Sequence, residues 1–138
     1  MGPLKDITVI EFSGIGPGPY CGMLLADLGA DVIRVSRKGA EGFENKYDIH
    51  NRSKRSITAD LKNKESVAEL LKLIAQVDVV FEGFRPGVME KLGIGPDDCL
   101  KVNPKLVYGR MTCWGQEGPL SKLAGHDINY ISLSGALN

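Results

Sequence analysis

The stretch "ITVIEFSGIGPGPYCGMLLADLGADVIRV", residues 7–35, decides the fold of this 138-residue chain. Its first six residues, 7–12, are β-branched and almost continuously apolar, which is typical of a strand buried on both faces. After a glycine- and proline-rich loop, apolar residues recur with the spacing of one helix face, at Cys21, Leu24, Leu25 and Leu28. Gly29 is placed to end that helix, and residues 31–35 have the pattern of a second strand. This order of elements predicts a right-handed βαβ unit.

The rest of the chain continues the alternation of strands and helices. Residues 56–61, 77–84 and 105–111 have strand patterns, and residues 36–55 have the composition of a long loop. A helix after Asn63, its predicted N-cap, has an apolar face formed by Val67, Leu70, Leu71 and Ile74. Two short helices follow, one over 85–93 with Pro86 in its first turn and one over 96–102. Strands that alternate with helices predict an α/β fold around a parallel sheet.

Composition narrows the class of protein. Seventeen basic and seventeen acidic residues cancel, which removes the bulk electrostatic attraction to nucleic acid or anionic lipid. The three cysteines lack zinc-site spacing and close pairing, so we expect no metal site and a reducing intracellular compartment. No apolar stretch reaches about 18 residues, and the N-terminus lacks a basic segment followed by an apolar one. We therefore expect a soluble protein without a membrane span.

The glycine loop resembles a dinucleotide-binding fingerprint only in part. Gly14 and Gly16 occupy the first two glycine positions, but Pro19 stands where the third glycine should fall. Pro17 and Pro19 have no N–H to donate to a pyrophosphate. The second strand is followed by Arg37 instead of the acidic residue that holds a ribose. These departures argue against NAD binding and favour a loop that packs closely over a ligand or a neighbouring chain.

Basic side chains gather around the predicted strand ends, at Arg34, Arg37, Arg52, Lys54, Arg55 and Arg85. Open α/β sheets bind ligands at the carboxyl ends of their strands, and a guanidinium fork matches two phosphate oxygens. A group of arginines there predicts a ligand that carries more than one phosphate. The alternative for each residue taken alone is a solvated surface charge.

One histidine precedes an apolar run near the C-terminus. Asp127 is predicted to cap a helix that continues through residues 128–137, which places the ring of His126 beside the positive end of that helix. We expect this imidazole to be buried and neutral, and so able to accept a proton. An ordinary structural histidine is the alternative. The chain has no G-x-S-x-G motif for a serine hydrolase.

Five blocks of the chain resemble the α-methylacyl-CoA racemases, members of the family III CoA-transferase superfamily. They are "GPGPYCGMLLADLGADVIRV", "NRSKRSITADL", "FRPGVMEKLGIGP", "YGRMTCWGQEGP" and "LAGHDINYISLSG", and the resemblance runs from about residue 4 to the end. It implies that residues 1–138 are the N-terminal part of a CoA-binding, Rossmann-like large domain, with flanking helices and no second domain in this chain. The large domain is then incomplete, since relatives draw its last elements from a later part of the chain.

The resemblance also implies roles for particular residues. Arg37, Arg52, Arg55 and Arg85 would hold the phosphates of CoA, and Ala59 and Leu61 would lie where the adenine is received. His126 would act as the base on one face of the substrate. An aspartate from a later block serves the opposite face in that family, and the 138 residues stop before this block. Coenzyme A is part of the substrate, so no separate cofactor is expected.

The function that the resemblance implies is inversion of C2 in 2-methyl-branched acyl-CoA thioesters through an enolate. A family III CoA-transferase is one alternative, and a non-catalytic fragment that binds CoA or dimerises is another. Relatives form interlocked homodimers, so a second copy of the chain is the expected protein partner. A mitochondrial, peroxisomal or cytoplasmic location is compatible with the resemblance.

Overall fold

The chain forms a five-stranded sheet with helices on both faces, and the computed structural model describes residues 2–12, 14–39 and 47–137. The elements follow one another as β1 (Thr8–Phe12), α1 (Pro17–Asp27), β2 (Asp31–Ser36), the 3₁₀ turn η2 (Ile49–Asn51), β3 (Lys54–Thr58), α2 (Lys64–Ile74), β4 (Val79–Glu82), α3 (Val88–Lys91), α4 (Pro96–Val102), β5 (Val107–Arg110) and α5 (Asp127–Ser134). The predicted α/β fold with a parallel sheet is confirmed.

The strands lie in the order β3-β2-β1-β4-β5, and every neighbouring pair is parallel. All five carboxyl ends therefore lie at one edge of the sheet. The chain moves outward from β1 in one direction through β2 and β3, and in the other through β4 and β5. The carboxyl ends of β1 and β4 thus flank the point where the strand order reverses, which is where open α/β sheets bind ligands.

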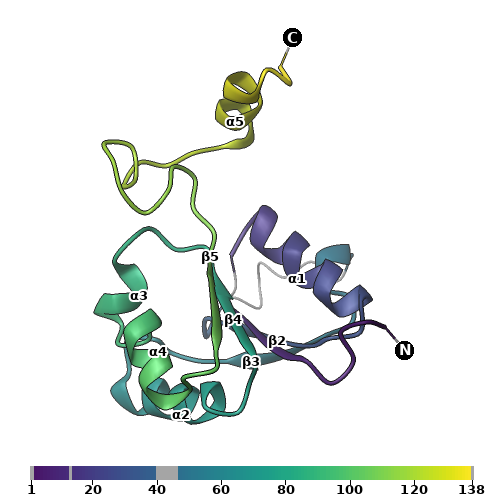
Figure 1. The fold of residues 1–138 in the computed structure, drawn as a ribbon, viewed down its shortest axis with the longest axis vertical. Helices are drawn as coiled ribbons and strands as arrows, with labels where there is room; N and C mark the ends of the chain where they lie inside the picture. The colour runs from purple at the N-terminus through teal and green to yellow at the C-terminus, as the bar shows by residue number, and fades with distance from the viewer. Residues whose placement is uncertain (1, 13, 40–46, 138) are drawn as a thin grey trace.

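Two cores hold the layers together. Figure 1 shows α1 on one face of the sheet and α2, α3 and α4 on the other. The larger core lies under the three helices and joins β1, β2 and β4 to Leu70, Ile74 and Met89. The smaller core packs Ala26 of α1 against Val9, Val32 and Phe81. Burial of both sheet faces explains why the inner strands have continuous apolar sequences.

The local sequence explains both where α2 begins and which face it buries. The Asn63 side chain accepts hydrogen bonds from the backbone N–H groups of Glu65 and Ser66, at 2.8 and 3.1 Å, and so caps the helix. Leu70 and Ile74, four residues apart, are the buried positions. The capped amphipathic helix predicted after Asn63 is confirmed.

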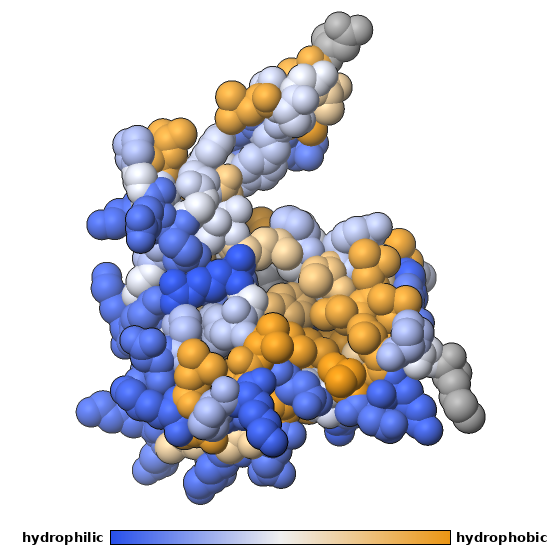
Figure 2. All heavy atoms as spheres, in the orientation of Figure 1, coloured by the Kyte–Doolittle hydropathy of each residue, from blue (hydrophilic) through white to orange (hydrophobic). Residues whose placement is uncertain are grey.

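The structure corrects the predicted face of α1. Leu24 and Leu28 are exposed, and the buried positions are Gly22, Met23 and Ala26. Cys21 and Leu25 of the predicted face pack at the border of the smaller core, so the helix is rotated from the predicted orientation and the prediction holds only in part. Figure 2 shows apolar side chains gathered at the surface over α1 and the adjoining strands. Gly29, with φ of 100°, follows the end of the helix as predicted.

Three other boundaries differ from the sequence expectations. The strand expected over 56–61 is β3, which begins at Lys54 and ends at Thr58. The short helix α3 begins at Val88 after Gly87, which has a left-handed backbone, so Pro86 lies outside the helix. The expected loop over 36–55 contains η2 and the start of β3, while residues 40–46 lie outside the described part of the chain.

Residues 112–137 form a C-terminal arm beyond β5. Figure 1 shows this arm leaving the carboxyl edge of the sheet and carrying α5 away from the other helices. The cysteines Cys21, Cys99 and Cys113 are free. Within the described residues, none of the helices has the length and apolar character that crossing a bilayer requires.

Candidate functional site

The carboxyl edge of the sheet brings together part of the predicted phosphate site. Arg37 follows β2 and Arg85 follows β4, and both side chains are exposed. Within the described ranges, neither guanidinium has a hydrogen bond or ion pair to another part of the chain. Free guanidinium groups at this edge are available to bind an anionic ligand.

Ala59 and Leu61 reach the same edge after β3, but as part of the core. Ala59 is buried, and its backbone N–H donates to the carbonyl of Ser36 at 2.9 Å. Leu61 packs against the larger core from its border. Both side chains contribute to the core, and their predicted contact with adenine stays a prediction.

Arg52 and Arg55 lie at the opposite, amino edge. Arg52 donates from Nε to Asp27 at 3.0 Å and from Nη2 to the same carboxylate, which ends α1. Arg55 makes the equivalent pair with Asp31, the first residue of β2, with an Nε distance of 2.8 Å. The hydrogen bond from Arg52 holds the pKa of Asp27 below its usual range. The four arginines predicted to act together are therefore divided between two edges of the sheet.

A small pocket lies between the segments that follow β4 and β5. Its walls are Gly83, Phe84, Arg85, Pro86, Met111, Thr112, Cys113, Ser121 and Leu123. Glu82, buried at the end of β4, accepts a hydrogen bond from the backbone N–H of Phe84 at 2.7 Å and so fixes the turn that carries Arg85. Burial raises the pKa of Glu82. The pocket thus joins a free guanidinium to the arm that continues to His126.

His126 begins α5, but its surroundings differ from the sequence expectation. Its backbone is extended, with φ of −130° and ψ of 167°, so His126 is the N-cap and Asp127 is the first helical residue. The Asn129 side chain accepts from the backbone N–H of His126 at 2.9 Å. This bond fixes the helix start one residue before Asp127, which was the predicted cap. The expected burial of His126 is also wrong, because the residue is exposed on the arm.

A buried ion pair between Lys54 and Glu11 was missed from the sequence. Lys54 Nζ lies 2.6 Å from Glu11 Oε2 and donates to the carbonyl of Pro19 at 2.9 Å. The side chains are 2% and 0% exposed, so Lys54 is not a surface charge. Burial raises the pKa of Glu11, and the ammonium group opposes that shift. The single acidic residue inside the apolar stretch "ITVIEF" was the available signal.

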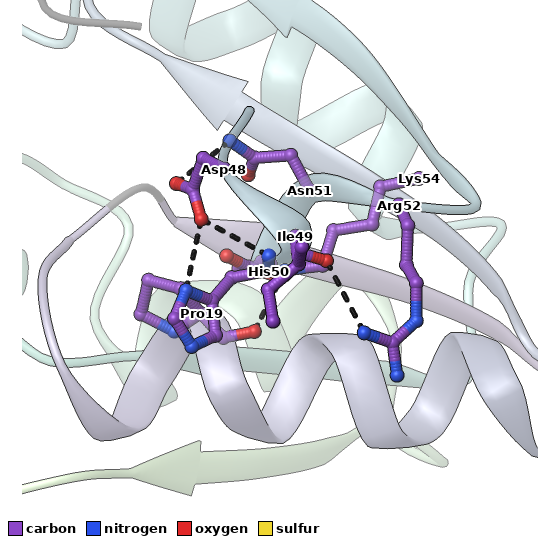
Figure 3. Close-up of polar contacts among 8 residues, drawn as sticks. Pro19, Asp48, Ile49, His50, Asn51, Arg52 and Lys54 are labelled. Carbon is purple, nitrogen blue, oxygen red and sulfur yellow. Dashed lines mark hydrogen bonds and ion pairs between the residues drawn. The ribbon is translucent and has the colours of Figure 1, made fainter. Parts of the chain in front are cut away.

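His50, the other histidine of the chain, is held by contacts with Asp48 and with Tyr20 of α1. Asp48 caps η2 by accepting from the backbone N–H of His50 at 3.0 Å, and His50 Nδ1 lies 2.8 Å from the same oxygen (Figure 3). The ring of Tyr20 in α1 meets the His50 ring edge-on, with centroids 6.4 Å apart. The contact between the two rings attaches η2 to α1.

The glycine loop after β1 stands open. An added Cβ at Gly14, Gly16 or Gly18 would meet no described atom within 4 Å, and Gly16 has a positive φ of 72°. Close packing of this loop over a ligand or a neighbouring chain therefore stays a prediction.

Among the described residues, no group of three or more histidine, cysteine or acidic side chains could hold a metal ion.

The comparisons with known proteins agree with this geometry. The model of the family described as "CoA-transferase family III" matches residues 4–138. The chain belongs to that family. Alpha-methylacyl-CoA racemase of Mus musculus is 51% identical over 98% of the chain, and that of Homo sapiens is 48% identical over 98%.

A third relative is named a probable fatty acyl-CoA transferase of Mycobacterium tuberculosis, and it is 39% identical over 91% of the chain. A crystal structure of the same protein superposes with a TM-score of 0.89, covering 99% of this chain and 39% of that one. The chain spans 34% and 35% of the length of the two racemases. It therefore corresponds to about a third of each relative, and the fold of family III proteins is confirmed for that part.

Proposed function

We propose that the protein is an α-methylacyl-CoA racemase, with His126 as the base on one face of a 2-methylacyl-CoA thioester. The observation that carries this proposal is the identity of 51% and 48% to two racemases, against 39% to the fatty acyl-CoA transferase. The family III CoA-transferase fold is common to these relatives. The choice of racemase therefore rests on the closer sequence match.

The chemistry suits a base at the start of a helix. The thioester acidifies the α-hydrogen at C2, and an imidazole placed beside that carbon removes the proton. The negative charge then develops on the thioester oxygen, where donors must already be in place. The start of α5 leaves the backbone N–H groups of Asp127 and Ile128 without intrahelical partners, and these can serve as such donors.

In this proposal, the carboxyl edge of the sheet binds CoA. Arg37 and Arg85 contact phosphate oxygens, and the backbone at Ala59 and Leu61 contacts the adenine. The ion pairs of Arg52 and Arg55 give those two residues a structural alternative to phosphate binding. Acyl-CoA is the small-molecule partner. The homodimer that the resemblance implies stays a prediction.

Deuterium uptake at C2 tests the proposal. Incubate the chain with 2-methylacyl-CoA in D₂O and follow the mass of the thioester. We expect His126→Gln to slow uptake by about 10²–10⁴-fold, the usual contribution of a positioned acid or base, with unchanged affinity for CoA. His50→Gln, at the only other histidine, is the matched control and should retain uptake. Equal uptake by wild type and His126→Gln would contradict the proposed role.

The same preparation separates the two alternatives. Transfer of CoA from the thioester to a labelled free acid would identify a family III CoA-transferase. Binding of CoA without either transfer or deuterium uptake would identify a non-catalytic CoA-binding fragment.

A further inference from the structure

The backbone on both sides of His126 is held by residues of the same arm. The indole Nε1–H of Trp114 donates to the carbonyl of Ala124 at 3.2 Å. The Cys113 thiol donates to the carbonyl of Gly125 at 3.8 Å, and the N–H of His126 itself donates to Asn129. The two consecutive peptide units that precede the histidine, 124–125 and 125–126, therefore have fixed partners.

Position 125 is occupied by glycine because the surrounding atoms leave no room for a side chain. A Cβ built at this position would lie 2.4 Å from the hydroxyl oxygen of Tyr130 and 2.9 Å from the Cβ of Cys113. The α-carbon of Gly125 is thus enclosed between α5 and the segment after β5. Any larger residue would push the backbone before His126 out of this position.

An aromatic pair adds a further contact between the segment after β5 and α5. The rings of Trp114 and Tyr130 lie 5.8 Å apart at a tilt of 57°, which is favourable for an aromatic pair. A hydrogen bond joins the Tyr130 hydroxyl to Cys113 and raises the pKa of Tyr130 to about 12. At the base of the arm, Arg110 Nη1 donates to Gln116 Oε1 at 2.9 Å. The arm is therefore tied to β5 at its root and to itself around His126.

We infer that Cys113, Trp114 and Tyr130 are positioning residues for His126, because they fix the backbone at 124–126 that sets where the imidazole stands. We call these three residues the clamp. The inference rests on the proposed role of His126 as a base. His126 is exposed, so the hydrophobic core does not hold it in place. A general base must reach its proton within hydrogen-bond distance, and small displacements of such a group lower the rate steeply.

Trp114→Phe tests the clamp, since it keeps an aromatic ring beside Tyr130 and removes the donor to Ala124. Local opening is read from hydrogen exchange of the His126 amide, and function from deuterium uptake at C2 of 2-methylacyl-CoA. We expect His126 amide exchange to become about 3- to 10-fold faster, as loss of one hydrogen bond predicts. We expect uptake to fall about 10-fold with unchanged affinity for CoA, because the phosphate contacts lie elsewhere.

Ser132→Ala is the matched control. Ser132 lies on α5, and its hydroxyl donates at 2.5 Å to the carbonyl of Ile128, which is not a clamp residue. Both readouts should match wild type in this variant. Gly125→Ala should slow uptake further than Trp114→Phe, and adding Tyr130→Phe should restore part of the loss because the shortest clash is with the hydroxyl oxygen.

Two outcomes would overturn the inference. One is His126 amide exchange in Trp114→Phe equal to that of wild type and Ser132→Ala. The other is unchanged deuterium uptake in Trp114→Phe while wild type is active. Absence of uptake by wild type would contradict the proposed function instead, and amide exchange would then decide alone whether the clamp holds the backbone.

Discussion

At the scale of single residues, the same side-chain type takes different roles according to the edge of the sheet that it reaches. Arg37 and Arg85 stand free at the carboxyl edge, while Arg52 and Arg55 pair with Asp27 and Asp31 at the amino edge. The sequence could not separate these pairs, because the strand was expected to begin at residue 56. With β3 beginning at Lys54, Arg55 lies inside the strand, beside the start of β2.

Substitution of these arginines distinguishes phosphate binding from structural pairing. We expect Arg85→Gln to weaken CoA binding by about tenfold, because it removes one charge-assisted contact, and to make the affinity less sensitive to salt. Arg52→Gln, the matched control, should leave the affinity for CoA and its salt dependence unchanged. Calorimetric titration with CoA and dephospho-CoA at two ionic strengths measures both effects. A loss of affinity in Arg52→Gln equal to that in Arg85→Gln would support the role implied by the resemblance.

At the scale of elements, sequence patterns identified where strands and helices lie better than which face they bury. For α2 the cap, the apolar spacing and the buried face all agree, because the helix packs through its largest apolar residues. For α1 the apolar spacing and the buried face differ. Glu11 and Lys54 occupy the space beneath this helix, and Gly22 lies against them. No local pattern in α1 reveals a charged pair contributed by two distant strands.

The close approach of α1 predicts a position-specific effect of alanine. A Cβ at Gly22 would lie 1.9 Å from Glu11 Oε2, and that side chain is fully buried and bonded to Lys54. We expect Gly22→Ala to destabilise the fold by about 1–3 kcal/mol through overpacking, despite the higher helix propensity of alanine. Gly18→Ala is the control in the same helix, since its Cβ meets no atom within 4 Å. Urea denaturation should show a lower midpoint for Gly22→Ala alone; equal midpoints would mean that the ion pair can move aside.

At the scale of the whole molecule, the order of elements was predictable and the site was not fully so. The βαβ pattern of residues 7–35 and the later alternation yield the parallel sheet, since each element has a local signal. Placement of His126 depends instead on contacts between Trp114, Gly125 and Tyr130, which the sequence separates by 16 positions from first to last. His126 was recognisable, but its exposure on an arm beyond the sheet was not.

A polypeptide limited to residues 1–138 should exchange the α-proton without inversion, because the resemblance places the base for the opposite face in a later block. His126 can remove the α-proton and return solvent deuterium through the same imidazole, which retains configuration. Inversion requires a donor on the opposite face, and lack of a positioned acid or base slows such a step by about 10²–10⁴-fold. Each enantiomer of 2-methylacyl-CoA is incubated separately in D₂O, with deuterium followed by mass and configuration by chiral chromatography. We expect one enantiomer to gain deuterium with retention and neither to invert at a comparable rate. Equal and rapid interconversion of both enantiomers would falsify this prediction, because a second base would then have to lie within these residues.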